Sequence, residues 1–364
     1  MVTRTWDSSK ANAFDAFFNS GLDSRGTGDV PTQLIIGGGA LLFANGEPRE
    51  IVGHWNSASQ EWEPLGLPGV VHIPAAAADD LHTYNSTLLA SGTINSFENI
   101  TAWDADTELW SDYTDATLGD VVTAMADGIE DSDLYASTTG GTEMLYQRDS
   151  GTGAWAALTI PSGGSNVLAL AGYSGDSHMY VGGSFTGVTT SDKISRWRAG
   201  TWRSVGGIDP NGDVSTLLEF GGDMIVGGAF TSIGGSPFVR IAAWDTSSYS
   251  ALGSGLDSTP DDMVIYDGDL VVVGSFTSAG GVSDTRGVGV WDGSVWSSIG
   301  GLDAGNLTAA TVYKGDLVVT GTGFTTIGGS SATRVARWNG STWTGMGAGL
   351  NTGGTTIHTT TAIV

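Results

Sequence analysis

Carboxylates are the side chains of this 364-residue chain that could most readily do chemistry, because it contains 39 Asp and Glu. Two carboxylates at a fixed separation can act as acid and base in glycoside hydrolysis. In so acidic a chain, close pairs arise from composition alone. Asp209-Pro-Asn-Gly-Asp213 is more specific, since Asp209, Asn211 and Asp213 place oxygen ligands at alternate positions, as in a calcium loop. The segment lacks the Gly at position 6 and the Glu at position 12. It makes calcium the one candidate cofactor, with a solvated turn as the alternative.

The remaining residue types form no catalytic pattern. The five histidines show no metal-ligand spacing, and the chain has no cysteine for a thiolate site or a disulfide. No Gly-x-Ser-x-Gly nucleophile motif occurs, and no glycine-rich run continues into Gly-Lys-Ser/Thr. These observations predict a protein that is not an enzyme and has no catalytic residues.

Positive charge is scarce but clustered. The formal net charge is −25, which argues against a nucleic-acid partner because such binding needs a basic surface. Three of the 14 basic residues, Arg196, Arg198 and Arg203, lie within eight positions and flank Trp197 and Trp202. They are candidates for contact with an acidic partner. The alternative, which we favour, is that they neutralise carboxylates on an adjacent repeat unit.

The kind of charge is also informative. The chain has 30 Asp against 9 Glu, and 11 Arg against 3 Lys. Many aspartates with few lysines are typical of proteins from extreme halophiles, where salt at about 1 M shortens the Debye length to roughly 3 Å and screens self-repulsion. The alternative is an acidic, soluble surface at ordinary salt. No stretch has the length of a membrane span, and the first residues lack the apolar run of a signal peptide.

The elements that must position these residues belong to a repeated unit. An apolar run ending in Gly-Gly-x-Phe-Thr, as in 180–186, precedes a tryptophan, and a second aromatic residue follows five or seven positions later. The first position of this pair recurs every 45 to 49 residues. Its seven occurrences are Trp55, Trp103, Arg148, Trp197, Trp244, Trp291 and Trp338.

Each unit predicts four short strands, because its apolar stretches are β-branched, alternate with polar residues and end at glycine-rich turns. Four strands in about 47 residues match one blade of a propeller. We therefore predict an all-β fold, a seven-bladed β-propeller of four-stranded blades. Segment 33–36 begins the first unit as a second strand, and 355–364 resembles a first strand with no successor. The C-terminal strand should therefore close the first blade.

The unit resembles the kelch repeat, on the evidence of its apolar run, Gly-Gly and aromatic pair. Trp55 with Trp62 and Trp103 with Trp110 match that repeat best. The later units resemble glycine-rich relatives that read Gly-Gly-x-Phe-Thr, Gly-Gly, Arg-(Ile/Val)-Ala, Trp. The resemblance covers about residues 33–364 and implies a propeller that binds proteins or glycans. The catalytic residues of the few kelch-like enzymes have no counterparts in this chain.

The first 30 residues differ in kind from the repeats. We predict two parts, an N-terminal arm at 1–30 and the propeller at 31–364. The arm could form a short helix that presents Phe14, Phe17 and Phe18 on one face. These residues are candidates for contact with a partner subunit, and the alternative is a segment folded back on the propeller. Trp6 lies 49 positions before Trp55, so a partial extra unit is also open.

Features that recur in every unit belong to the scaffold, and features found in one unit are candidates for function. By this rule Arg240, Arg286 and Arg334, which precede the tryptophan of three units, should have a structural role. The irregular third unit, with Arg148 in place of Trp, is a candidate partner contact.

The favoured function is a virion surface or tail structural protein of a tailed virus that infects a halophile. It would contact other structural proteins, in a symmetric assembly, or a host-surface glycan or glycoprotein. One alternative is a cellular glycan- or protein-binding propeller, in the cytoplasm or at the cell surface of a halophile. The other is a polysaccharide hydrolase or lyase.

Overall fold

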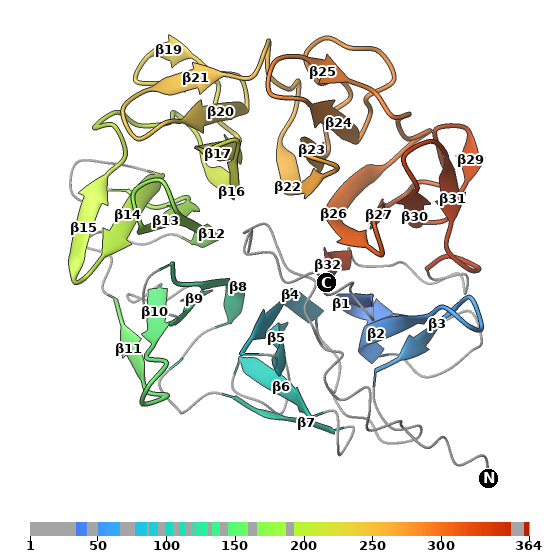
Figure 1. The fold of residues 1–364 in the computed structure, drawn as a ribbon, viewed down its shortest axis with the longest axis horizontal. Helices are drawn as coiled ribbons and strands as arrows, with labels where there is room; N and C mark the ends of the chain where they lie inside the picture. Colours follow the sequence, from blue (N-terminus) through green and yellow to red (C-terminus); the bar gives the residue numbers. More distant parts are fainter. Residues whose placement is uncertain are drawn as a thin grey trace.

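The structure is a computed structural model of an all-β protein. It describes residues 34–41, 50–65, 77–85, 87–93, 99–104, 109–113, 118, 121–129, 133–138, 145–158, 166–186, 193–350 and 360–363. Seven four-stranded antiparallel sheets are arranged as blades around a central axis (Figure 1). No helix occurs among these residues, so none there could span a membrane. The predicted seven-bladed propeller is confirmed.

The strands of each blade are named here from the central axis outward. Blade 1 consists of β32 (Thr360–Ile363), β1 (Ile35–Leu41), β2 (Glu50–Asn56) and β3 (Glu61–Pro64), and blade 2 of β4 (Ala77–Tyr84), β5 (Thr87–Thr93), β6 (Ile100–Asp104) and β7 (Leu109–Asp112). Blade 3 consists of β8 (Val122–Asp127), β9 (Leu134–Thr138), β10 (Leu145–Arg148) and β11 (Trp155–Ala157). Blade 4 consists of β12 (Val167–Tyr173), β13 (His178–Gly183), β14 (Ile194–Arg198) and β15 (Thr201–Ser204).

Blades 5 to 7 follow the same order. Blade 5 consists of β16 (Val214–Phe220), β17 (Asp223–Gly228), β20 (Ile241–Trp244) and β21 (Tyr249–Ala251). Blade 6 consists of β22 (Pro260–Tyr266), β23 (Asp269–Gly274), β24 (Val288–Trp291) and β25 (Trp296–Ser297). Blade 7 consists of β26 (Asn306–Tyr313), β27 (Asp316–Thr322), β30 (Val335–Trp338) and β31 (Trp343–Gly345). Two small hairpins, β18 (Ser232–Ile233) with β19 (Ser236–Pro237) and β28 (Thr326–Ile327) with β29 (Ser330–Ser331), lie in the loops between the second and third strands of blades 5 and 7.

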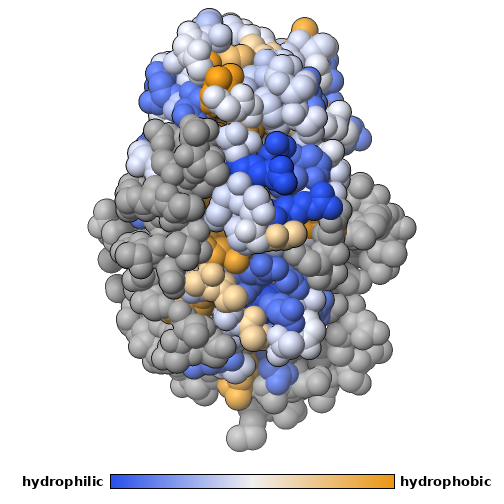
Figure 2. Space-filling model, turned by 90° about the vertical axis from the view of Figure 1, so that its left-hand side faces the viewer, coloured by the Kyte–Doolittle hydropathy of each residue, from blue (hydrophilic) through white to orange (hydrophobic). Residues whose placement is uncertain are grey.

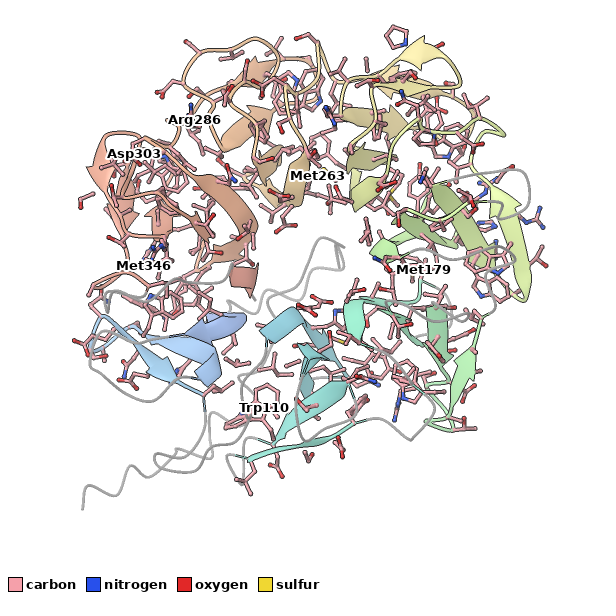
Figure 3. All side chains as sticks on the ribbon, turned by 180° about the vertical axis from the view of Figure 1, so that it is seen from behind. Trp110, Met179, Met263, Arg286, Asp303 and Met346 are labelled. Carbon is pink, nitrogen blue, oxygen red and sulfur yellow. The ribbon has the colours of Figure 1, made fainter. Side chains whose placement is uncertain are left out.

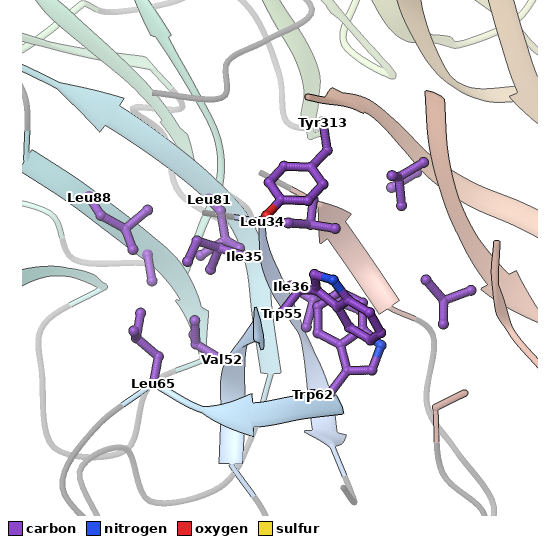
Figure 4. Close-up of a cluster of buried hydrophobic side chains, with 14 of the residues drawn as sticks. Leu34, Ile35, Ile36, Val52, Trp55, Trp62, Leu65, Leu81, Leu88 and Tyr313 are labelled. Atoms are coloured by element: carbon purple, nitrogen blue, oxygen red, sulfur yellow. The ribbon is translucent and has the colours of Figure 1, made fainter. Parts of the chain in front are cut away.

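The ring closes as the sequence predicts. Strand β32 pairs antiparallel with β1, so that Ile36 faces Ile363 and Gly37 faces Ala362. A buried cluster supports this blade: Leu34 and Ile36 lie near Trp55 and Trp62, with Tyr313 from blade 7 beside them (Figure 4). The N-terminal part of the chain, with Trp6 and the predicted arm at 1–30, lies outside the described residues.

The repeated aromatic pair joins blades as well as strands. Its two members face each other across the outer two strands of a blade, as with Trp291 and Trp296, and their ring centroids are 5.4 Å apart. The outer tryptophan also reaches the preceding blade. The indole Nε1 of Trp296 donates to the Leu252 carbonyl at 2.8 Å, and that of Trp343 donates to the Ile299 carbonyl at 2.7 Å. The outer tryptophans therefore link neighbouring blades.

The second glycine of the Gly-Gly motif, and Gly321 at the same place in blade 7, permit a close approach of two backbones. A Cβ at Gly228 would lie 2.1 Å from the Asp213 carbonyl oxygen, and one at Gly321 would lie 2.0 Å from that of Asn306. Both contacts occur where the inner strand carries a β-bulge, near Val214 in blade 5 and Leu307 in blade 7. Any larger residue would force the two inner strands of the blade apart.

The residue four positions before the inner tryptophan adopts a left-handed backbone. Its φ is 68° at Arg240, 78° at Gly287 and 62° at Arg334. Blade 6 therefore uses Gly287 where its neighbours use arginine, and Arg286 lies one position earlier than the repeat requires. The guanidinium of Arg240 donates to the Ala229 carbonyl at 2.7 Å. This contact agrees with the predicted structural role, and its acceptor is a backbone carbonyl of the loop.

Candidate binding surface at the seam of blades 4 and 5

The predicted calcium segment contains a loop cap that recurs in other blades. Asn211 Oδ1 accepts the N–H groups of Thr231 and Ser232, at 2.8 and 3.0 Å. Asp257 and Asp303 bind the corresponding loops of blades 6 and 7 in the same way. Because this cap is repeated, the side chain of Asn211 belongs to the scaffold.

The two aspartates that flank this cap have separate surroundings. Asp213 Oδ1 forms an ion pair with Lys193 Nζ of blade 4, at 2.9 Å, while the Asp209 carbonyl accepts the Gly234 N–H at 3.0 Å. The described residues hold no group of three or more His, Cys, Asp or Glu placed to bind a metal. Calcium at Asp209, Asn211 and Asp213 stays a prediction.

Many of the acidic residues cap exposed turns. Asp245 Oδ1, just after the inner tryptophan of blade 5, accepts the N–H groups of Ser247 and Ser248 at 2.8 and 2.7 Å. Hydrogen bonds from the Ser247 hydroxyl and from these N–H groups lower the pKa of Asp245 to about 2. Asp292 forms the same turn in blade 6. Part of the excess of acidic residues in this chain is therefore explained by aspartates that accept backbone N–H groups in the turns of the repeat.

Two pairs of adjacent aspartates lie on the inner strands of blades 2 and 6. They are Asp79 and Asp80 on β4 and Asp261 and Asp262 on β22; Met263, next to Asp262, lies on the inner side of blade 6, whereas Arg286 lies farther out (Figure 3). Asp80 Oδ2 accepts the Met125 N–H of blade 3 at 2.7 Å. Sequence reasoning did not identify these four residues. The available signal was an Asp-Asp pair near the start of the first strand, which units 2 and 6 have and the other units lack.

Burial raises the pKa of these carboxyls. The pKa of Asp80 and of Asp261 rises to about 6, and that of Asp262 to about 7. The negative charges of Asp80 and Asp261 contribute to the shift at Asp262. Asp262 Oδ2 also accepts the Ala310 N–H of blade 7 at 2.8 Å, so this carboxyl links two neighbouring blades.

The three clustered arginines share one face of the outer hairpin of blade 4. Arg196 pairs with Arg203 across β14 and β15, and Trp197 pairs with Trp202. Side chains alternate along a strand, so Arg196, Arg198 and Arg203 point one way and the two tryptophans the other. The tryptophans pack against a core cluster that includes residues of blade 3. The arginines therefore face blade 5.

Arg196 binds an acid of its own blade. Its Nη1 pairs with Asp176 Oδ2 in the turn between β12 and β13. The Tyr180 hydroxyl donates to the same oxygen at 3.0 Å, and it accepts the indole N–H of Trp244, in blade 5, at 3.1 Å. The interpretation that these arginines neutralise carboxylates of an adjacent blade is therefore wrong for Arg196, because the nearest acid is brought in by the turn of its own sheet.

The other two arginines are exposed. Arg198 Nη1 lies 3.5 Å from the Asp176 carbonyl, and Arg203 has an exposed side chain that forms no ion pair with the described residues. Figure 2 looks at the side of the ring that carries β15, and its most hydrophilic surface gathers just above the middle of the view. We name Arg198, Arg203 and the outer edge of β15 the arginine edge.

The seam beneath the arginine edge has unused hydrogen-bonding capacity. The Tyr249 hydroxyl, His178 Nε2 and Arg196 Nε are buried and have no hydrogen-bond partner among the described residues. Burial raises the pKa of Tyr249, with the phenol of Tyr180 as a further cause. Such atoms are usually satisfied by bound water or by a ligand. The seam of blades 4 and 5 therefore combines clustered positive charge with a polar interior.

The remaining predicted contacts have different outcomes. Arg148 takes the place of the inner tryptophan of blade 3 and lies over the Tyr113 ring of blade 2, 4.7 Å from its centroid. It therefore contributes to the blade-to-blade packing for which tryptophan is used elsewhere. Phe14, Phe17 and Phe18 lie outside the described residues.

No protein-family model matches this chain, and no curated protein matches it. Three solved structures resemble it. The extracellular domain of a protein assigned as a one-component system in B. thetaiotaomicron is 12% identical with a TM-score of 0.53, over 85% of this chain and 39% of that one. A chain of the mitotic checkpoint complex is 13% identical with a TM-score of 0.53, over 78% and 80%. The WD40 β-propeller domain of Doa1 is 16% identical with a TM-score of 0.52, over 74% and 82%.

These likenesses define the class of fold. At such identities they show a β-propeller, in agreement with the seven blades described above. The chain spans well under half of the first of these proteins.

Proposed function

We propose that this propeller is a non-enzymatic interaction module whose contact surface includes the arginine edge. The observation that carries the proposal is the exposure of Arg198 and Arg203 on one face of blade 4, in a chain of net charge −25. Functional residues on a repeat scaffold are expected where the repeat is broken. The aromatic pairs, Gly-Gly motifs and loop caps recur and are accounted for by folding.

Within this class, we propose a virion surface or tail protein of a virus that infects a halophile. Support comes from the composition, with 30 Asp and 3 Lys, and from the C-terminal strand, which closes the ring by covering the inner edge of β1. The kelch-like relationship is part of the same proposal and is supported by the recurring aromatic pair and Gly-Gly motif. The partners would be neighbouring structural proteins or a host-surface glycan or glycoprotein.

Particle fractionation tests this setting. The protein should co-purify with purified virus particles through a density gradient, and chemical cross-links within those particles should include residues of blade 4. Absence of the protein from the particles would refute the virion assignment. Recovery from the cell surface or cytoplasm of a halophile, with binding to a glycan array at high salt, would support the cellular alternative.

An enzyme is the second candidate, and the inner-strand carboxylates favour it. Asp261 and Asp262 have pKa values of about 6 and 7, which suit acid–base chemistry near neutral pH. A polysaccharide hydrolase or lyase would use such groups. Turnover of cell-surface polysaccharide that Asp261→Asn abolishes and Arg203→Glu leaves intact would establish this alternative against the interaction module.

A further inference from the structure

The seam of blades 2 and 3 is the place where an arginine replaces the inner tryptophan of the repeat. Arg148, at the end of β10, pairs with the outer tryptophan, Trp155, on β11. Residues that face each other across antiparallel strands have side chains on the same side of the sheet. The Arg148 guanidinium lies over the Tyr113 ring of blade 2, 4.7 Å from its centroid. This side of the hairpin therefore faces blade 2.

Two buried N–H donors at this seam have no acceptor. In blades 6 and 7 the outer tryptophan donates from Nε1 to a carbonyl of the preceding blade, at 2.8 and 2.7 Å. Trp155 is only 7% exposed, yet its Nε1 has no hydrogen-bond partner among the described residues, and neither has Arg148 Nε. A buried donor without an acceptor costs roughly 1–3 kcal/mol. The seam therefore favours an added group that accepts hydrogen bonds.

The positive charge of Arg148 is not neutralised by the acids of its own blade. Arg148 forms no ion pair with the described residues. Three acids next to the strands of blade 3 interact with other groups, namely Asp127 with His82, Asp133 with Gln147 and Ser150, and Asp149 with Thr152. In a chain of net charge −25, a half-buried guanidinium without a carboxylate is an exception.

The surroundings of the guanidinium keep its N–H groups available. A Cβ at Gly153, in the turn between β10 and β11, would lie 3.0 Å from Arg148 Nη2, so this glycine leaves room for the side chain. The contact with the Tyr113 ring is a cation–π contact, which uses none of the N–H groups of the arginine. Blade 1 has the same unpartnered indole at Trp62, but it lies beside Trp55 and has no charge.

We propose that the seam of blades 2 and 3 binds the carboxylate of a small acidic ligand. Arg148 would form the ion pair, and the indole N–H of Trp155 would be a second donor. Arginine can hold a carboxylate through two N–H groups at once, which sets the orientation of the ligand. A sugar acid and a free organic acid share this group. The site is separate from the arginine edge, so the interaction function above does not depend on it.

Isothermal titration calorimetry on the full chain tests the proposal with acetate, D-glucuronate and D-glucose as probes. At about 1 M sodium chloride the Debye length is roughly 3 Å, so the net charge of −25 does not repel the probes at a distance. We expect acetate and D-glucuronate to bind and D-glucose not to bind, because D-glucose has no carboxylate. Tighter binding of D-glucuronate than of acetate would identify a sugar acid, and equal binding a free organic acid.

Variants of blade 3 locate the site. Arg148→Trp introduces the residue that the other six units carry at this position, so the chain should fold and should bind acetate at least about tenfold more weakly. Trp155→Phe keeps an aromatic ring without the indole N–H and should weaken acetate binding about fivefold. Arg286→Gln removes an exposed arginine of blade 6 and is the control, which should bind acetate as the wild type does.

Three results would overturn the proposal. They are a failure of acetate to bind, binding of D-glucose as strong as that of D-glucuronate, and equal effects of Arg148→Trp and Arg286→Gln. Association of the protein with virus particles, measured by the fractionation described above, would be unchanged in each case. A failure of this site is therefore distinguishable from a failure of the interaction function.

Discussion

At the residue scale, one amide shows how a polar side chain can be absorbed by the scaffold. Asn211 holds the loop at Thr231 and Ser232 just as Asp257 and Asp303 hold theirs. The carboxylates add a hydrogen bond from a threonine hydroxyl, and Asn211 replaces it by donating from its own Nδ2 to Thr231 at 3.0 Å. Asparagine therefore meets the need of the loop without an added charge.

Removal of this cap separates the structural role from calcium binding. We expect Asn211→Ala to lower the free energy of unfolding by about 1 kcal/mol, because the N–H groups of Thr231 and Ser232 exchange their side-chain acceptor for water. The contacts predict that the loss is the same with calcium or with EDTA, measured by thermal unfolding. A calcium site would instead make the wild-type melting temperature fall in EDTA and make the variant insensitive to it.

The Gly-Gly motif offers a second residue-scale test. Gly228→Ala places a Cβ against the Asp213 carbonyl, and overpacking of this kind should cost about 1–3 kcal/mol. Gly151→Ala is the matched control, since its Cβ would meet only Asp149 at an ordinary 3.5 Å. Denaturant unfolding of both variants measures the difference. Equal stabilities would show that the inner strands can separate at no cost.

At the element scale, the inner strands carry charge that folding makes unfavourable. The pKa of Asp262 rises from its ordinary value near 3.8 to about 7, so the folded chain binds this proton more tightly than the unfolded chain. Stability from this group is therefore greatest at low pH and falls as the pH rises toward 7. Asp80 and Asp261, with pKa values of about 6, act in the same direction.

Replacement of the carboxyl tests this pH dependence. Asp262→Asn should raise the free energy of unfolding relative to wild type, and this increase should be roughly 1–2 kcal/mol larger at pH 8 than at pH 5. The reason is that the variant has no charge to desolvate. Asp292→Asn should show no such trend, because hydrogen bonds from Val295 and Ser294 lower the pKa of that carboxyl. Thermal unfolding at both pH values compares the two. If the stability difference between Asp262→Asn and wild type were the same at both pH values, the carboxylate of Asp262 would be fully hydrated in the folded wild-type protein.

The periodicity of the sequence predicts the strands and their pairing well, but it does not predict which charged side chains form ion pairs. The expected pairing of Trp291 with Trp296 is found because a repeated hydrophobic pattern fixes the register of a hairpin. The acid beside Arg196 could not be predicted, since Asp176 is 20 positions away and reaches it only through the fold of the first hairpin. The sequence predicts that Arg286 is equivalent to Arg240. In the structure Gly287 has the left-handed backbone of Arg240, so Arg286 lies one position before the equivalent place.

At the scale of the whole molecule, stability depends on a ring whose two ends share one blade. Blade 1 takes β32 from the C-terminal part of the chain and β1, β2 and β3 from the N-terminal part. Its buried cluster also includes Tyr313 of blade 7 and Leu81 of blade 2. Strand β32, of four residues, also contacts β26 of blade 7 and β4 of blade 2, so it touches three consecutive blades.

Deletion of residues 360–364 tests this dependence. We expect the truncated chain to unfold at a lower temperature and to aggregate, because the inner edge of β1 is exposed. A synthetic peptide of the deleted residues, added in excess, should restore part of the lost stability by mass action. Unchanged melting of the truncated chain would show that six complete blades hold the ring without the closing strand.

The same closure sets an order on synthesis. A ribosome delivers β1, β2 and β3 early and β32 only after all the other strands, so the first blade waits with an unpaired inner edge while six further blades emerge. The nascent protein is then a curved, open array, exposed to strand pairing between neighbouring chains on one polysome. Cellular factors that shield such edges should therefore raise the yield of this protein.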